Sequence, residues 1–175
     1  KYFPDVKVLR MDNDTTQVKN AYQKILTEFG NTKPAVLVGT QMIAKGHDFK
    51  DVTVVGIVDA DQSLYQSDYK STERTFELIT QMAGRAGRSD ATGKVILQTY
   101  APRHYAYKFI ANYNYKGFFN KEINLRETAK FPPFTTIIRL LFTSENEELT
   151  RTIVKQCHNK LYDLSNEYKD DFVYY

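Results

Sequence analysis

Four runs of apolar residues in the first part of the chain predict buried strands. They are KVLRM at 7–11, AVLVGT at 35–40, VTVVGIVD at 52–59 and KVILQTY at 94–100. Near-continuous Val, Ile and Leu is typical of strands that are covered on both faces, because a strand with one face in water would alternate apolar and polar residues. These segments therefore indicate a sheet inside the molecule.

Two segments between these runs have the apolar spacing of amphipathic helices. Residues 14–30 predict a helix that is capped by Thr15 or Thr16 and ended by Gly30. Residues 71–84 predict a second helix, capped by Ser71 or Thr72. The resulting order of strand, helix, strand, strand, helix and strand favours an α/β fold with an open, mainly parallel sheet.

The pattern changes after residue 103. Aromatic residues recur at helix-like spacing from 104 onward, until Pro132 and Pro133 interrupt the segment. Residues 135–142, TTIIRLLF, then predict a strand, and residues 146–168 predict a strongly amphipathic helix. One strand and one helix are too little for a stable domain. We therefore expect a sheet domain at 1–103, a connecting helical segment at 104–130 and an incomplete α+β domain at 131–175.

Length and composition narrow these expectations. The chain has 175 residues, 42% apolar and 26% charged, and no apolar run approaches the ~18 residues that a membrane span needs. The single cysteine, Cys157, excludes an internal disulfide framework and a zinc site with several cysteines. The first residues contain neither a starting methionine nor a leader, so we expect a piece of a longer, cytoplasmic protein. A net charge of +3 is too small to indicate nucleic-acid binding by electrostatics alone.

Ligands of open α/β sheets gather at the carboxyl ends of the strands, which directs attention to the loops there and to the end of the helix at 71–84. The loop GTQMIAKGHDF follows the second strand at 39–49. Gly39 permits close backbone approach, and the Thr40 hydroxyl with nearby amides suits a phosphate. Gly46 permits a tight turn ahead of Asp48. The same residues are common in ordinary strand-to-helix loops, so this loop alone leaves both interpretations open.

Asp59 and Asp61 lie at the end of the third strand. Two carboxylates there could bind a metal, orient a basic partner or cap the next segment. No third ligand is clustered with them in the sequence, which favours a structural or relay role. The three histidines likewise lack the companions that a metal site requires: His47, His104 and His158. We therefore expect no metal site in this chain.

The stretch QMAGRAGRS at 81–89 places two arginines among small residues. Gln81, Arg85 and Arg88 are spaced at i, i+4 and i+7, so they share one face if the helix continues. An arginine can bond two phosphate oxygens through its fixed fork and keeps its charge. The alternative is a solvated helix end at which the arginines favour the helix dipole.

The order of these motifs resembles the second RecA-like lobe of superfamily 2 helicases. GTQMIAKGHDF is similar to helicase motif V, and QMAGRAGR to motif VI. Together with DADQSL, ILQTYAP and FPPF they resemble the family of primosomal protein N prime, PriA, the bacterial replication-restart helicase. The resemblance runs from about residue 8 to about residue 141. It departs at Ser67, where proline is expected, and at Lys70, where arginine is expected.

The resemblance implies a fold and a set of roles. The fold is a lobe of the P-loop NTPase superfamily, with helices on both faces of an open, mainly parallel sheet, followed by the partial α+β extension. Arg88 would be the arginine finger on the γ-phosphate of ATP, with Arg85 beside it and Gln81 positioning the nucleotide or its water. The implied ATP contacts are Gly46, Asp48, Arg85 and Arg88, and the implied DNA contacts are Gly39, Thr40 and Gln41.

The resemblance also implies what lies outside this chain. The sequence has no GxxxxGK[ST] phosphate loop and no DExH-type box, so ATP and Mg²⁺ would be held mainly by an upstream lobe. Zinc is expected in the full-length protein, but not in this part of it.

The implied activity is that of an ATP-dependent 3′ to 5′ DNA helicase in replication restart and primosome assembly, located in the cytoplasm at the nucleoid. The chain alone would be inactive. The implied partners are single-stranded and forked DNA, primosome and replication-restart proteins and single-stranded DNA-binding protein, with no membrane partner. Two alternatives stay open: lobe 2 of another superfamily 2 helicase, such as a branch-migration helicase, and a stand-alone nucleic-acid-binding module.

Overall fold

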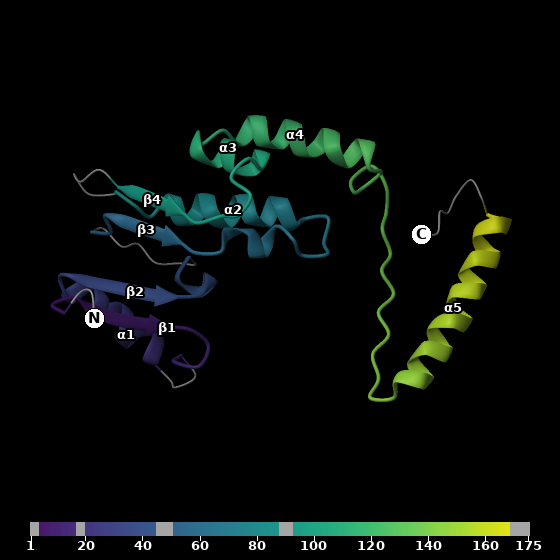
Figure 1. The fold of residues 1–175 in the computed structure, drawn as a ribbon, viewed down its shortest axis with the longest axis horizontal. Coiled ribbons are helices and arrows are strands. Elements are labelled where there is room, and N and C mark those ends of the chain that lie inside the picture. The colour runs from purple at the N-terminus through teal and green to yellow at the C-terminus, as the bar shows by residue number, and fades with distance from the viewer. Residues whose placement is uncertain (1–3, 17–19, 45–50, 88–92, 169–175) are drawn as a thin grey trace. The chain divides into compact units, whose positions relative to one another are not determined.

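The computed structural model describes residues 4–16, 20–44, 51–87 and 93–168. The chain divides into two compact units, residues 1–131 and 132–175. The first unit contains the strands and most of the helices, and the second contains one long helix (Figure 1). Each unit is described by itself below.

The strands of the first unit form two parallel pairs. Strand β1 (Lys7–Met11) pairs with β2 (Ala35–Gly39), and β3 (Val54–Ile57) pairs with β4 (Lys94–Leu97). All of these strands point the same way (Figure 1). The predicted strands and the α/β class are thus confirmed, although each pair forms its own hydrogen-bonded ladder.

Helix α1 (Ala21–Asn31) lies between β1 and β2, and it buries Leu26. It ends one residue after the predicted stop, but the predicted caps are wrong. The hydroxyl of Thr15 accepts from the amide of Asp12 at 2.9 Å, and the hydroxyl of Thr16 donates to the Asp12 carbonyl at 2.7 Å. Both threonines therefore close a turn after β1 instead of starting the helix.

Helix α2 (Ser71–Ala83) matches the predicted helix within one residue. Its buried face includes Phe76 and Ile79, which fits an amphipathic helix. No side chain caps its amino end, where Lys70 is the N-cap residue. Ser71 is instead buried, and its carbonyl accepts a hydrogen bond from the hydroxyl of Thr75 at 2.8 Å.

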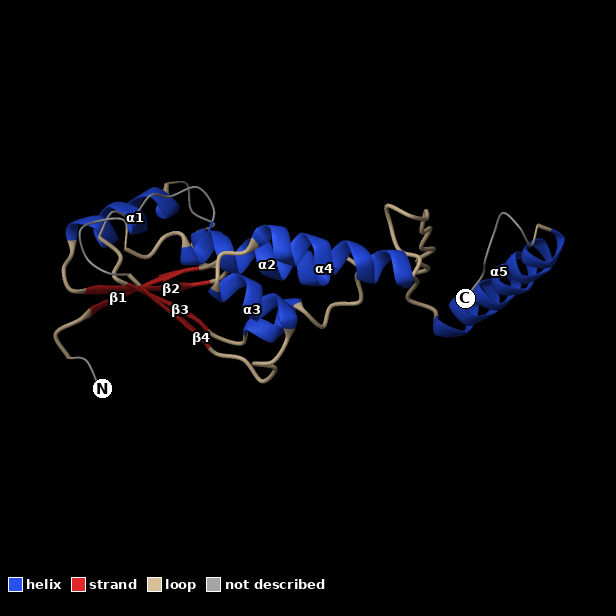
Figure 2. Ribbon diagram, turned by 90° about the horizontal axis from the view of Figure 1, so that it is seen from above, coloured by secondary structure: helices blue, strands red, loops and turns tan. Residues whose placement is uncertain are grey.

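The segment after β4 packs into the core of the first unit. Helix α3 (Tyr105–Ala111) contributes Tyr107 and Ile110 to the core, and helix α4 (Tyr115–Thr128) contributes Phe118. The Phe76 and Phe118 rings stack with centroids 4.0 Å apart. Helices α2 and α4 accordingly run beside each other (Figure 2). The helical segment is part of the sheet unit in this structure.

The second unit differs from its prediction in one respect. Residues 135–142 form no strand, and apolar side chains such as Ile138 and Leu141 are exposed. A strand requires a partner for its backbone donors and acceptors, and the described residues of this unit supply none. Helix α5 (Glu147–Glu167) forms as predicted, and the Asn146 side chain caps it by accepting from the Leu149 amide at 3.0 Å.

Within the described residues, no helix has the length and apolar character needed to cross a membrane.

Candidate functional site

The loop after β2 contains the residues predicted to contact DNA. Gly39 ends the strand, and a Cβ at this position would lie 2.0 Å from the Met11 carbonyl oxygen and 2.7 Å from Cδ1 of Ile43. Thr40 is exposed, and its carbonyl accepts from the Ile43 amide at 3.1 Å. Gln41 is exposed and begins the short 3-10 helix η1 (Gln41–Ala44). The close approach at Gly39 is thus to the neighbouring strand, and this packing holds the exposed Thr40 and Gln41 at the strand end.

The remaining residues of this motif, Gly46 and Asp48, lie outside the described residues, and so does His47. The description resumes at Asp51, whose carboxylate pairs with the Lys33 ammonium at 2.5 Å.

The predicted arginine motif does not continue as a helix. Helix α2 ends at Ala83, and residues 84–87 form a turn in which the Arg85 amide donates to the Met82 carbonyl at 3.0 Å. Gly87 has a φ of 73°, which a helix does not allow and which glycine adopts without strain. The condition for one shared face, a helix that continues through the motif, is therefore not met beyond Ala83. Gln81 is exposed, Arg85 is half-buried, and Arg88 lies outside the described residues.

The turn at 84–87 is held at the amino ends of β3 and β4. The Gly87 amide donates to the carbonyl of Val52, just before β3, at 3.0 Å. A Cβ on Gly93, just before β4, would lie 2.4 Å from the Gly87 amide nitrogen. Because α2 runs back along the strands, its last turn returns to the end at which they start. The prediction that it lies with the carboxyl-end loops is therefore wrong, and the described parts of the two motifs, 39–44 and 81–87, lie at opposite ends of this unit.

Asp61 lies at the carboxyl ends of β3 and β4, in the short helix η2 (Ala60–Ser63). Its side chain is 4% exposed. The carboxylate accepts from the Thr99 hydroxyl at 2.6 Å, the Tyr100 amide at 2.6 Å and the Tyr107 hydroxyl at 2.7 Å. Burial works to raise the pKa of Asp61, but these hydrogen bonds outweigh it and hold the pKa below its usual value.

The two predicted carboxylates therefore have different environments. Asp61 joins the start of η2 to the β4–α3 connection. This is a structural role, which was one of the possibilities for a carboxylate at the strand end. Asp59 is exposed with a φ of 51°, and its amide donates to Oε1 of Gln98 at 2.6 Å. Across the part of the chain that is described, no group of three His, Cys, Asp or Glu side chains is placed to hold a metal ion.

An ionic cluster that the sequence analysis missed joins α2 to α4. The Arg126 guanidinium contacts the Glu73 carboxylate at 2.6 Å and the Glu122 carboxylate at 3.2 Å. The Tyr105 hydroxyl donates to Glu122 at 2.5 Å, and Arg126 lies over the ring of Tyr69. Only the spacing of Glu122 and Arg126 at i, i+4 could have indicated this cluster.

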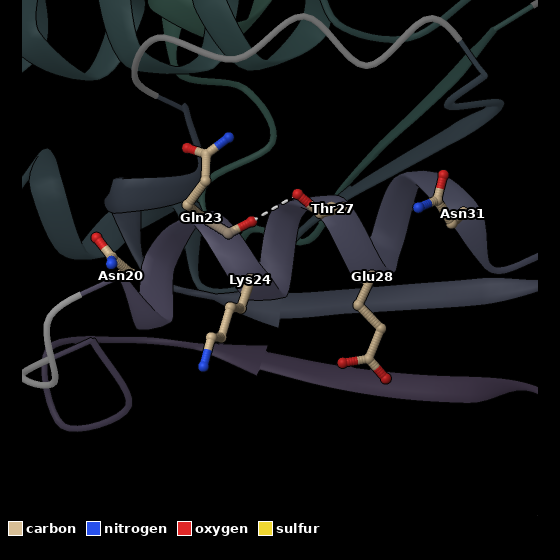
Figure 3. A pocket seen from close by; sticks show the side chains of 6 residues that line it. All are labelled: Asn20, Gln23, Lys24, Thr27, Glu28 and Asn31. Atoms are coloured by element: carbon tan, nitrogen blue, oxygen red, sulfur yellow. Dashed lines mark hydrogen bonds between the residues drawn. The ribbon is translucent and has the colours of Figure 1, made fainter.

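A shallow pocket on α1 coincides with none of the predicted site residues. Its lining comes from that helix and its amino end, and it consists of Asn20, Gln23, Lys24, Thr27, Glu28 and Asn31 (Figure 3). The Thr27 hydroxyl donates to the Gln23 carbonyl at 2.9 Å, so it is already used within the helix.

Residues 1–90 of the chain match the family described as helicase conserved C-terminal domain. The chain belongs to this family. Membership in this family explains why GTQMIAKGHDF precedes QMAGRAGR along the chain. The predicted resemblance to helicases is thereby confirmed. The family match ends at residue 90, whereas the compact unit extends to residue 131. In this chain β4, α3 and α4 therefore complete the core of the helicase C-terminal domain.

Three relatives of this helicase C-terminal domain share one name, Replication restart protein PriA. The chain is 44% identical to the protein of Bacillus subtilis over 154 residues. The aligned region covers 88% of the chain and 19% of the relative. Identity to the Synechocystis protein is 43% over 152 residues, covering 86% and 18%. Identity to the Chlamydia pneumoniae protein is 38% over 159 residues, covering 91% and 21%. The chain thus spans about a fifth of the length of these relatives.

Proposed function

We propose that this chain is the second motor lobe of an ATP-dependent DNA helicase of the PriA type, which moves 3′ to 5′ and acts in replication restart. The proposal includes a RecA-like lobe with helices on both faces of its sheet. The observation that carries it is the similarity to PriA proteins across most of the chain, at 44% identity to the Bacillus subtilis protein. The described residues of the two helicase motifs, 39–44 and 81–87, lie at opposite ends of one α/β unit, which supports it.

The turn after α2 serves ATP in this proposal. Arg88 contacts the γ-phosphate, Arg85 lies beside it, and Gln81 positions the nucleotide or its water. Gly46 and Asp48 are further ATP contacts in this proposal. ATP and Mg²⁺ are held mainly by another lobe of the full-length protein, and zinc is held elsewhere. The bond from the Gly87 amide to Val52 supports this role, because it ties the turn that precedes Arg88 in the sequence to the start of β3. A fixed arginine can stabilise charge that develops on a phosphoryl group without first paying to reorganise.

The loop after β2 serves DNA. Thr40 and Gln41 contact backbone phosphates, and Gly39 sets the position of both. The exposure of Thr40 and Gln41 supports this role, as does the packing of Gly39 on β1. Closing and reopening of the ATP cleft would then move one end of a rigid unit, and with it the DNA contact at the other end. The partners in this function are single-stranded and forked DNA, primosome and replication-restart proteins, and single-stranded DNA-binding protein.

The test uses the full-length protein that contains this chain. We expect ATP hydrolysis that single-stranded DNA stimulates, and unwinding of a duplex with a 3′ tail. Arg88→Ala should lower kcat on the order of 10³-fold with little change in DNA affinity, because a finger acts on charge that is present only in the transition state. Arg88→Lys should also fail, since an ammonium lacks the fork that spans two oxygens.

Arg139→Ala is the matched control, since Arg139 lies in the second unit, outside both motifs, and it should keep wild-type turnover. Absence of DNA-stimulated hydrolysis in the unaltered full-length protein would overturn the proposed activity. Normal hydrolysis with lost DNA binding in Arg88→Ala would instead assign the arginine motif to DNA. The isolated chain should not hydrolyse ATP, because it has no phosphate loop.

A further inference from the structure

Two exposed tyrosines flank the carboxyl ends of β3 and β4. Tyr65 follows η2 and is 73% exposed, and Tyr100 follows β4 and is 85% exposed. Neither ring belongs to the hydrophobic core of the first unit. Both rings are therefore accessible to a ligand.

Both tyrosines are attached through their backbones to Asp61. The Tyr65 amide donates to the Asp61 carbonyl at 3.3 Å, and the Tyr100 amide donates to the Asp61 carboxylate at 2.6 Å. One buried residue therefore anchors the backbone at both tyrosines, so these backbones need not be ordered when a ligand binds.

The charges around the two rings suit a nucleic-acid strand. Exposed Arg103 lines the same hollow as Tyr100, together with Ala101, Pro102 and His104. Among the residues that the structure describes, Arg103 has no ion-pair partner, so it can meet a phosphate. Asp59 is exposed just after β3, and its negative charge disfavours a phosphate group next to it. A neutral base is the part of a nucleotide that fits an aromatic ring beside a carboxylate.

We propose that Tyr65 and Tyr100 form a stacking surface for successive bases of single-stranded DNA, with Arg103 on an adjacent phosphate. The choice of DNA as the ligand rests on the proposed function. All of the strands are parallel, so the surface lies at the same end of them as the Thr40 loop. The strand that Thr40 contacts through its backbone can thus present its bases to the tyrosines. Stacking on aromatic rings accepts every base, which suits an enzyme that moves along DNA of any sequence.

The experiment measures binding of a fluorescent oligo(dT) strand to the full-length protein by anisotropy. Tyr65→Ala and Tyr100→Ala should each weaken the affinity about 10-fold, as expected for the loss of one stacked base. Tyr100→Trp should keep wild-type affinity because it keeps a stacking ring. The control is Tyr113→Ala, which removes a tyrosine of similar exposure, 66%, between α3 and α4, and it should bind normally. An oligo with 5-iodouracil should cross-link to Tyr65 or Tyr100.

Unchanged affinity in the double variant Tyr65→Ala/Tyr100→Ala, with no cross-link at either residue, would overturn the inference. A loss that Tyr113→Ala shares would overturn it as well, because it would reflect a general effect of losing exposed tyrosines. The ATPase of the unaltered protein is measured with and without DNA in the same samples. DNA-stimulated ATPase together with the unchanged double variant would reject the stacking surface and leave the proposed function standing. Cross-linking without any ATPase would reject the proposed activity and keep the surface.

Discussion

Two single residues, Gly39 and Asp61, hold the structure together at the carboxyl ends of the strands. They do so in different ways. Gly39 acts by having no side chain, since the space in which a Cβ would lie is filled by the Met11 carbonyl. Asp61 acts as a buried acceptor for donors from the β4–α3 connection and from α3. A buried carboxylate is tolerated only where such donors replace water. Both residues are therefore required by packing before any ligand is considered.

Gly39→Ala tests the steric requirement. We expect it to lower the free energy of unfolding by about 2–3 kcal/mol, because the new methyl group overlaps backbone atoms of β1 that cannot move freely. Gly30→Ala is the matched control in the same unit, since a Cβ there meets nothing within 4 Å. It should be neutral or stabilise by about 0.5–1 kcal/mol, because alanine is the better helix former. Urea unfolding measures both variants, and equal effects would refute the steric role of Gly39.

At the scale of elements, α2 links the two ends of the sheet unit. Its amino-terminal half is tied to α4 through Glu73 and Arg126, and the turn after it is tied to Val52 through Gly87. The ring of Phe76, between these points, stacks on Phe118. Helix α2 is therefore held near both of its ends and in the middle.

Arg126→Ala tests the tie between α2 and α4. Its side chain is 11% exposed and Glu122 is 12% exposed, so removing the cation leaves a carboxylate unpaired in a largely dry site. We expect a loss of about 3 kcal/mol in the free energy of unfolding. Lys7→Ala removes a pair with Glu28 in which both partners are about half exposed, at 54% and 46%, and it should cost less than about 1 kcal/mol. Chemical denaturation compares the two, and similar losses would contradict a special role for the buried cluster.

At the scale of the whole molecule, the chain is a compact α/β unit followed by a unit that has little core of its own. No residue of α5 is buried among those described, and the apolar residues of 135–142 are exposed. The first unit instead has a core to which β3, α2, α3 and α4 all contribute. Its stability is therefore expected to be independent of residues 132–175.

Truncation tests this independence. A chain of residues 1–131 should unfold cooperatively with a Tm within about 2 °C of the whole chain, since every member of the core cluster is retained. A chain of residues 1–103 should have no cooperative transition, because it lacks the core residues Tyr107, Ile110 and Phe118. Circular dichroism during heating distinguishes the two. A folded 1–103 chain would restore the predicted boundary after residue 103.

The local sequence pattern was enough to predict strands β1 to β4, helices α2 and α5, and the two helicase motifs. Each of these features depends on residues that are close together in the sequence. The tertiary structure decided what depends on distant partners. Residues 135–142 form no strand because the described residues supply no neighbouring strand. The turn after α2 is set by the hydrogen bond between Gly87 and Val52. The role of Asp61 was set by donors 38 to 46 residues away. No local pattern contains such partners, since burial and long-range hydrogen bonds form only when the chain has folded.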